Sequence, residues 1–108
     1  MNDPILQSDF VCVLPSGERR ALTVLIGRPY QASSGEWWCP LALKGLTGER
    51  KGAAGEDALQ SLCLALRFVI SEMDRFIQTG GQILDREGRD PLPLGAYWDH
   101  GLGKGRPA

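Results

Sequence analysis

The sequence has 108 residues, of which 43% are hydrophobic and 23% are charged, and its 12 Lys and Arg nearly balance its 13 Asp and Glu. This length and composition indicate one globular domain with a single hydrophobic core, and they exclude a second independent domain. Because the net charge is −1, the chain has no excess of positive charge to neutralise phosphates, and we expect neither nucleic acid nor a membrane as its main partner.

The N-terminus and the apolar segments predict a soluble, cytoplasmic protein. Asp3 stands where a signal peptide needs basic residues. The longest apolar run, around residues 62–70, is interrupted by Arg67 and is too short to span a membrane. The cysteines form neither a closed disulfide framework nor a C-x-x-C pair, so we expect them to be reduced and buried. They are Cys12, Cys39 and Cys63.

Three segments have the composition and alternation of β-strands. Residues 10–14 are rich in β-forming side chains and precede a turn, and residues 20–27 alternate apolar side chains between two faces. Residues 37–43 alternate in the same way, and Pro40 limits that strand to an edge or a bulge. Residues 49–54 predict a weaker fourth strand. We therefore expect an antiparallel β-meander of three to four strands.

One long amphipathic helix is predicted for residues 56–79, because their apolar side chains recur at steps of three and four. Gly55 is the expected N-cap, and Gly80 with Gly81 is expected to end the helix through a left-handed residue. After the helix, residues 82–85 predict a short strand.

Together these elements predict an α+β fold, in which the meander is followed by the long helix packed on one sheet face and by an extended C-terminal tail. We expect a single domain over residues 1–98 and a disordered tail over residues 99–108. The predicted core consists of Phe10, Cys12, Leu22, Val24, Ile26, Trp37, Cys39, Leu41, Leu59, Leu62, Leu66, Val69, Met73 and Phe76. The uncovered sheet face is predicted to expose apolar surface. That surface would be formed by Val11, Val13, Leu25, Trp38 and Ala42.

Two short motifs resemble those of a known family. They are Trp-x-Cys-Pro at residues 37–40 and Gly-x-Asp-x-x-Gln-x-Leu at residues 55–62. The motifs resemble a small uncharacterised bacterial family in which a β-meander precedes one helix, and the resemblance extends over about residues 10–94. It implies the fold and a cytoplasmic bacterial setting, and it transfers no catalytic residues. Small domains of this kind often neighbour toxin genes or act as accessory partners.

No arrangement in the sequence is typical of an active site or a metal centre. The single histidine, His100, lies in a glycine-rich tail, whereas a metal site needs several ligands brought together. A pair of Cys39 or Cys63 with His100 is disfavoured as a nucleophile, because burial raises the pKa of a thiol and makes it inert. We therefore predict a non-enzymatic protein with no catalytic, cofactor-binding or metal-binding residues.

The predicted helix carries one anomaly. Projected at 100° per residue from position 56, Leu64 and Phe68 fall at about 80° and about 120°, within the polar face that also holds Glu72 and Arg75. An apolar pair of this kind can mark a second contact surface. The pair could contact a partner or a second copy, be plainly exposed, or be covered by the protein's own tail. The tail residues that could cover it are Leu92, Leu94, Tyr97 and Trp98.

These observations predict a small protein-interaction domain, either the immunity partner of a bacterial toxin or a similar accessory protein. Residues 55–108 hold two more acidic than basic side chains, which would complement a basic toxin. Two alternatives stay open: a small-molecule-binding protein or enzyme with a site near His100, and a structural homodimer whose exposed sheet faces pair. The predicted partner-binding residues are Trp38, Leu64, Phe68, Glu72 and Arg75.

Overall fold

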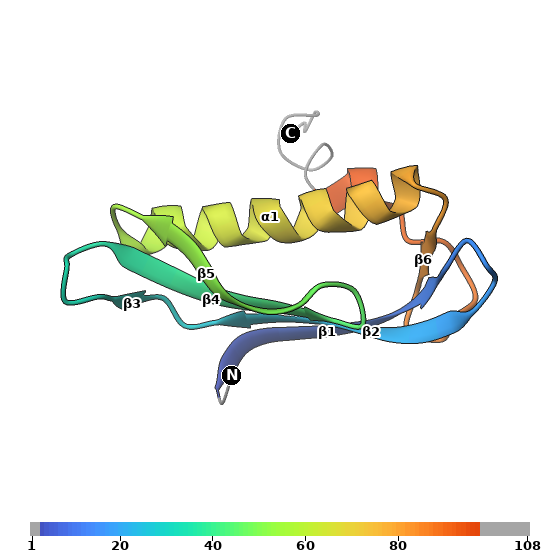
Figure 1. Cartoon of the computed structure of the whole chain (residues 1–108), viewed down its shortest axis with the longest axis horizontal. Helices are drawn as coiled ribbons and strands as arrows, with labels where there is room; N and C mark the ends of the chain where they lie inside the picture. The colour runs from blue at the N-terminus through green and yellow to red at the C-terminus, as the bar shows by residue number, and fades with distance from the viewer. Residues whose placement is uncertain (1–2, 98–108) are drawn as a thin grey trace, which may run out of the picture.

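A computed structural model describes residues 3–97, and for residues 48–51 it describes the backbone. It has the predicted α+β fold, in which one antiparallel sheet carries a single long helix across one face (Figure 1). The sheet has six strands rather than three to four. The elements in chain order are β1 (Pro4–Val13), β2 (Arg19–Gly27), β3 (Tyr30–Gln31), β4 (Trp37–Lys44), β5 (Gly48–Gly55), α1 (Ala58–Gln78), β6 (Gln82–Leu84) and the 3-10 turn η1 (Leu94–Tyr97).

The strands β1, β2, β4 and β5 form the predicted meander, in which each strand pairs antiparallel with the next. β4 pairs with β5 along one edge and with both β3 and β2 along its other edge, so that β3 continues the line of β2. β6 pairs with β1 on the far side of the sheet. The helix α1 therefore carries the chain from the β5 edge of the sheet to the β6 edge.

Local hydrogen bonds set both ends of α1. The N-cap is Asp57 rather than the predicted Gly55, and its carboxylate accepts the backbone N–H of Gln60 at 2.7 Å. The Gln60 side chain in turn accepts the N–H of Glu56 at 2.7 Å. At the other end the prediction is confirmed, because Gly80 has a φ of 105° and the N–H of Gly81 reaches the carbonyl of Phe76 at 3.0 Å.

The helix packs on the sheet through a face that overlaps the predicted one only in part. Leu59 is 69% exposed and Leu66 is 39% exposed, so their placement in the core was wrong. The buried helix residues are Ser61, Ala65, Val69 and Met73, with Ser61 and Ala65 at 0% exposure, and the centre of this face is rotated by about 50° from that of the predicted face. Ser61 tolerates burial because its hydroxyl donates to the carbonyl of Ala58 at 2.9 Å. These small side chains let α1 approach β4 and β5, which are its main contacts.

Most of the rest of the predicted core is confirmed. The fully buried members of the predicted set are Cys12, Leu22, Val24, Ile26, Cys39, Leu41, Val69 and Met73. Phe10, Leu62 and Phe76 are half-buried and pack against them, and Trp37 is also half-buried. The prediction missed four buried members of this core, namely Leu43, Ala65, Ile83 and Leu94.

The sheet face opposite α1 exposes less apolar surface than predicted. Leu25 and Ala42 were expected there as exposed residues, but they are 6% and 0% exposed. They lie directly opposite each other in the β2–β4 register, where neighbouring side chains shield both. Val11 is half-buried, and the loop at residues 85–90 approaches it at Gly88, whose carbonyl accepts a hydrogen bond from Arg19 at 3.0 Å.

This loop is closed by hydrogen bonds from Asp85. The Asp85 carboxylate accepts the N–H of Arg89 at 2.9 Å, and the Asp85 N–H donates to the carbonyl of Asp90 at 2.8 Å. Hydrogen bonds from backbone N–H groups, above all that of Arg89, hold the pKa of the Asp85 carboxyl below its usual value of 3.8. Partial desolvation acts in the opposite direction.

The orientation of α1 predicts unequal costs for two substitutions. Ala65→Leu should lower the free energy of unfolding by about 1–3 kcal/mol, because the larger side chain cannot fit between α1 and the sheet without displacing one of them. Leu59→Ala removes an exposed side chain and should change that free energy by less than about 0.5 kcal/mol. Urea unfolding followed by circular dichroism measures both values. A greater loss for Leu59→Ala would contradict the observed helix face.

The loop predicts a pH dependence that belongs to Asp85. Because its folded pKa is lowered, ionised Asp85 stabilises the folded state above its unfolded pKa, and this contribution is lost as the pH falls through the folded pKa. Asp85→Asn should therefore be less stable than the wild type at neutral pH, and the difference should shrink as the pH falls below about 4. Urea unfolding across that pH range measures it. A difference that does not vary with pH would show that the charge makes no contribution.

Candidate protein-interaction surface

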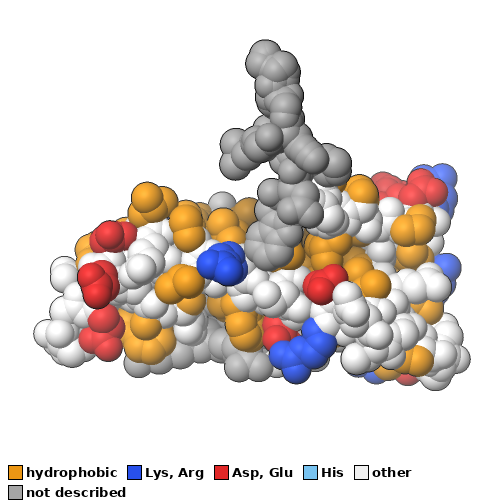
Figure 2. All heavy atoms as spheres, turned by 90° about the horizontal axis from the view of Figure 1, so that it is seen from above, with side chains coloured by type: hydrophobic (Ala, Val, Ile, Leu, Met, Phe, Trp, Pro, Cys, Tyr) orange, Lys and Arg blue, Asp and Glu red, His pale blue; other side chains and the backbone are white. Residues whose placement is uncertain are grey.

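The buried face of α1 is narrow, so the helix exposes apolar side chains on both of its flanks. Figure 2 looks down on the helix side of the molecule and shows hydrophobic side chains spread over the length of this surface. We call Leu64, Phe68, Glu72 and Arg75 the Leu64 flank. We call Leu59, Leu66 and Ile70 the Leu66 flank. The Leu64 flank holds all four helix residues that the sequence predicted to bind a partner.

An apolar hollow lies between the first half of the Leu64 flank and the sheet. It has a volume of about 230 Å³, with Leu64 and Phe68 from the helix on one side and Leu41, Gly52 and Ala53 from the strands on the other. Leu64 is 37% exposed, whereas Phe68 is half-buried and packs against the core. The hollow can therefore accept an apolar group from outside.

The backbone of β5 keeps this hollow open. Gly52 has a φ of 133°, and a Cβ at this position would lie 2.1 Å from the carbonyl oxygen of Cys39. The β4–β5 register shifts between Cys39 and Leu41, so Gly52 lies beside a β-bulge. Only glycine fits here, and no side chain at position 52 fills the hollow.

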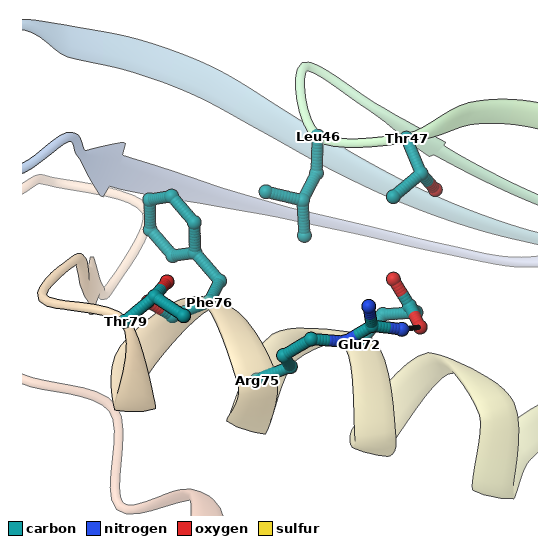
Figure 3. Close-up of a pocket in the computed structure, with 6 residues that line it drawn as sticks. All are labelled: Leu46, Thr47, Glu72, Arg75, Phe76 and Thr79. Atoms are coloured by element: carbon teal, nitrogen blue, oxygen red, sulfur yellow. Dashed lines mark hydrogen bonds and ion pairs between the residues drawn. The ribbon is translucent and has the colours of Figure 1, made fainter.

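A second hollow, of about 150 Å³, continues along the same flank towards the end of the helix (Figure 3). Leu46 and Phe76 point into it from opposite sides, and Thr47 and Thr79 lie near its ends. An ion pair of 2.5 Å joins Arg75 to Glu72 beside it, and the side chain of Glu72 is 11% exposed whereas that of Arg75 is 70% exposed. The largely buried carboxylate thus holds an exposed guanidinium at the rim.

Trp38, the fifth predicted residue, does not join this surface. It lies on β4 next to Cys39, whose side chain is in the core under α1, so the side chain of Trp38 points to the opposite sheet face. It is half-buried there. The structure therefore brings together Leu64, Phe68, Glu72 and Arg75 and separates Trp38 from them.

The described part of the C-terminal segment does not cover Leu64 and Phe68. Leu92 donates its N–H to the carbonyl of Ile83 at 2.9 Å, and Leu94 is buried in the core. Tyr97 is 52% exposed and lines a groove on the other flank of α1. Trp98 and the predicted disordered tail lie outside the described residues.

Two of the three cysteine thiols, those of Cys12 and Cys39, are buried. Burial raises the pKa of the Cys12 and Cys39 thiols, which makes them poor nucleophiles. Cys63 is exposed on α1, so the expectation that it is buried was wrong. Among the side chains that the structure describes, no three His, Cys, Asp or Glu residues group so as to hold a metal ion, and the alternative site near His100 lies outside residues 3–97. No helix in the same range is long and apolar enough to cross a membrane.

Comparison with known families identifies the class of protein that has this fold. The model of the family described as "Domain of unknown function (DUF6968)" matches residues 11–91, and the chain belongs to this family. The match includes all of α1 and both hollows of the Leu64 flank. It confirms the resemblance to an uncharacterised domain family. No curated protein and no solved structure matches the chain.

Proposed function

We propose that this chain is a protein-interaction domain that binds a partner through the Leu64 flank. The observation that carries the proposal is the apolar hollow beside Leu64, which is kept open by a glycine that no other residue can replace. Interfaces of this kind centre on an apolar side chain that enters a pocket, with polar groups around it. The Leu64 flank offers both, because the hollow is followed along the helix by the exposed guanidinium of Arg75.

The order of groups along the flank indicates the kind of partner. An apolar side chain of the partner would fill the hollow between Leu64 and Ala53, and an acidic side chain would meet Arg75 at the rim. Glu72 already holds Arg75 in place, so the guanidinium loses little side-chain freedom on binding. We expect the apolar anchor to supply most of the affinity and the charges to supply orientation.

The finer proposal is that the partner is a toxin, or another protein that this domain accompanies, in the cytoplasm of a bacterium. Two points support it. The resemblance of the motifs is to a bacterial family, and the second half of the chain holds two more acidic than basic side chains. These acidic groups would favour the approach of a basic partner, while Arg75 would contact an acidic group locally.

The test compares two lysine substitutions on opposite flanks of α1. Tagged wild type, Leu64→Lys and Leu59→Lys are used to capture proteins from cells of the source organism, and the bound proteins are quantified by mass spectrometry. Leu64→Lys should lose a stoichiometric partner by tenfold or more, because a charge at the hollow opposes entry of an apolar group. Leu59→Lys carries the same charge on the other flank and should retain it.

Circular dichroism and urea unfolding establish that both variants are folded. Equal retention of every stoichiometric partner by Leu64→Lys and by the wild type would overturn the assignment of this flank. Loss from both variants would also overturn it, because the effect would then not depend on the hollow.

A further inference from the structure

The end of the described chain lies at an apolar groove beside α1. Tyr97 is the last residue that the structure describes, and it lines this groove together with Leu6, Ser8 and Phe10 of β1 and Leu66 of α1. The groove has a volume of about 120 Å³, whereas one water molecule needs about 10–15 Å³. It therefore has room for a large side chain.

Apolar side chains on both walls of the groove are accessible to water. Leu6 on β1 is 40% exposed, Leu66 on α1 is 39% exposed and Tyr97 is 52% exposed. The groove is open because α1 packs mainly on β4 and β5, and because within residues 3–97 β6 pairs only with residues 11–13 of β1. One more apolar group in the groove would remove this surface from water.

Contacts within the described residues determine where the chain reaches the groove. Leu94, at the start of η1, is buried in the core, and the N–H of Ala96 donates to the carbonyl of Pro93 at 2.9 Å. Tyr97 ends this turn at the groove. Because the next residue is bonded directly to Tyr97, its effective concentration at the groove is on the order of millimolar or higher.

We propose that the side chain of this next residue, Trp98, occupies the groove, so that the chain covers the groove with its own indole ring. An indole is a large apolar group with one N–H donor, which usually finds a hydrogen-bond acceptor when it is buried. The groove matches both properties, because its lining side chains are apolar except for the hydroxyl groups of Ser8 and Tyr97.

Two points favour Trp98 over an occupant from another molecule. A separate molecule would lose its translational and rotational freedom on binding, whereas Trp98 is already attached beside the groove. The residues that follow it, Asp99, His100 and Gly101, offer no apolar side chain, so the indole is the apolar group that this part of the sequence brings to the groove. The cover lies on the Leu66 flank and leaves the Leu64 flank open for a partner.

Thiol protection tests the cover at two helix positions of matched exposure. Leu66 in the groove is 39% exposed and Leu64 on the opposite flank is 37% exposed, so without a cover the two positions should react alike. In a Cys63→Ser background, we expect Leu66→Cys to react with Ellman's reagent at least tenfold more slowly than Leu64→Cys, which corresponds to a groove that is occupied about 90% of the time. Adding Trp98→Ala should make the two rates equal, and Trp98→Phe should restore part of the protection.

Three results would overturn the proposal. Equal rates for Leu66→Cys and Leu64→Cys in the chain that retains Trp98 would show that the groove is open. Protection of Leu66→Cys that survives Trp98→Ala would show that another group covers the groove. Protection that disappears on dilution would assign the groove to a second copy of the chain.

Fluorine NMR of the full chain labelled with 5-fluorotryptophan observes Trp98 without a substitution in the groove. Trp98→Phe identifies its signal, which should differ in chemical shift from that of the urea-unfolded chain. Leu66→Lys should move the signal to the unfolded value and Leu64→Lys should leave it in place, with circular dichroism to establish that both variants are folded. A Trp98 signal at the unfolded shift in the otherwise unchanged chain would overturn the cover, and the partner-capture test of the Leu64 flank would stand independently of it.

Discussion

The close approach of α1 to β4 and β5 is the constraint on which the rest of the structure depends. It is made through Ser61 and Ala65, which are fully buried and too small to hold the helix away from the sheet. Gly55 begins this approach, since a Cβ there would lie 2.7 Å from the backbone nitrogen of Ser61. A helix that packs against a sheet through small side chains buries only a narrow strip of its surface, and its larger apolar residues lie beside that strip.

This packing of α1 on the sheet leaves two surfaces of different character. On the β5 side, Leu64 stands over a hollow in which Gly52 supplies no side chain, and the Glu72–Arg75 ion pair continues the same flank. On the β1 side, Leu66 faces a groove whose other wall is β1, and within residues 3–97 only residues 11–13 of that strand are paired on its outer side. The first surface is a pocket with charged surroundings, and the second offers backbone hydrogen bonds beside apolar side chains. They therefore suit different partners.

Much of the fold could be predicted because its determinants are local. Alternation located β2 and β4, and Gly80 located the end of the helix, since both signals depend on the nearest residues in sequence. The early start of β1 was not predictable in this way. Its first half contains Gln7, Ser8 and Asp9 and lacks an apolar alternation, and its pairing with β2 defines it as a strand.

The orientation of α1 could not be read from periodicity, because hydrophobicity places the leucines in the core. The structure instead buries Ser61, whose hydroxyl is satisfied within its own helix, and such a residue gives no hydrophobic signal. The position of Leu64 and Phe68 outside the predicted core face could be recognised in the sequence, because these apolar residues interrupt a polar face. The partners that shape their surroundings, among them Leu46 and Gly52, come from distant strands and turns and become evident only in the folded chain.

Thiol reactivity along the helix measures directly which face of α1 packs against the sheet. In a Cys63→Ser background, Leu59→Cys and Ser61→Cys each add one thiol to two thiols that are buried in the sheet. We expect Cys at position 59 to react with Ellman's reagent in the native protein as fast as Cys63 does in the wild type, and Cys at position 61 to react only on unfolding. Fast reaction at position 61 with protection at position 59 would contradict the account, because the helix would then rest on its leucines.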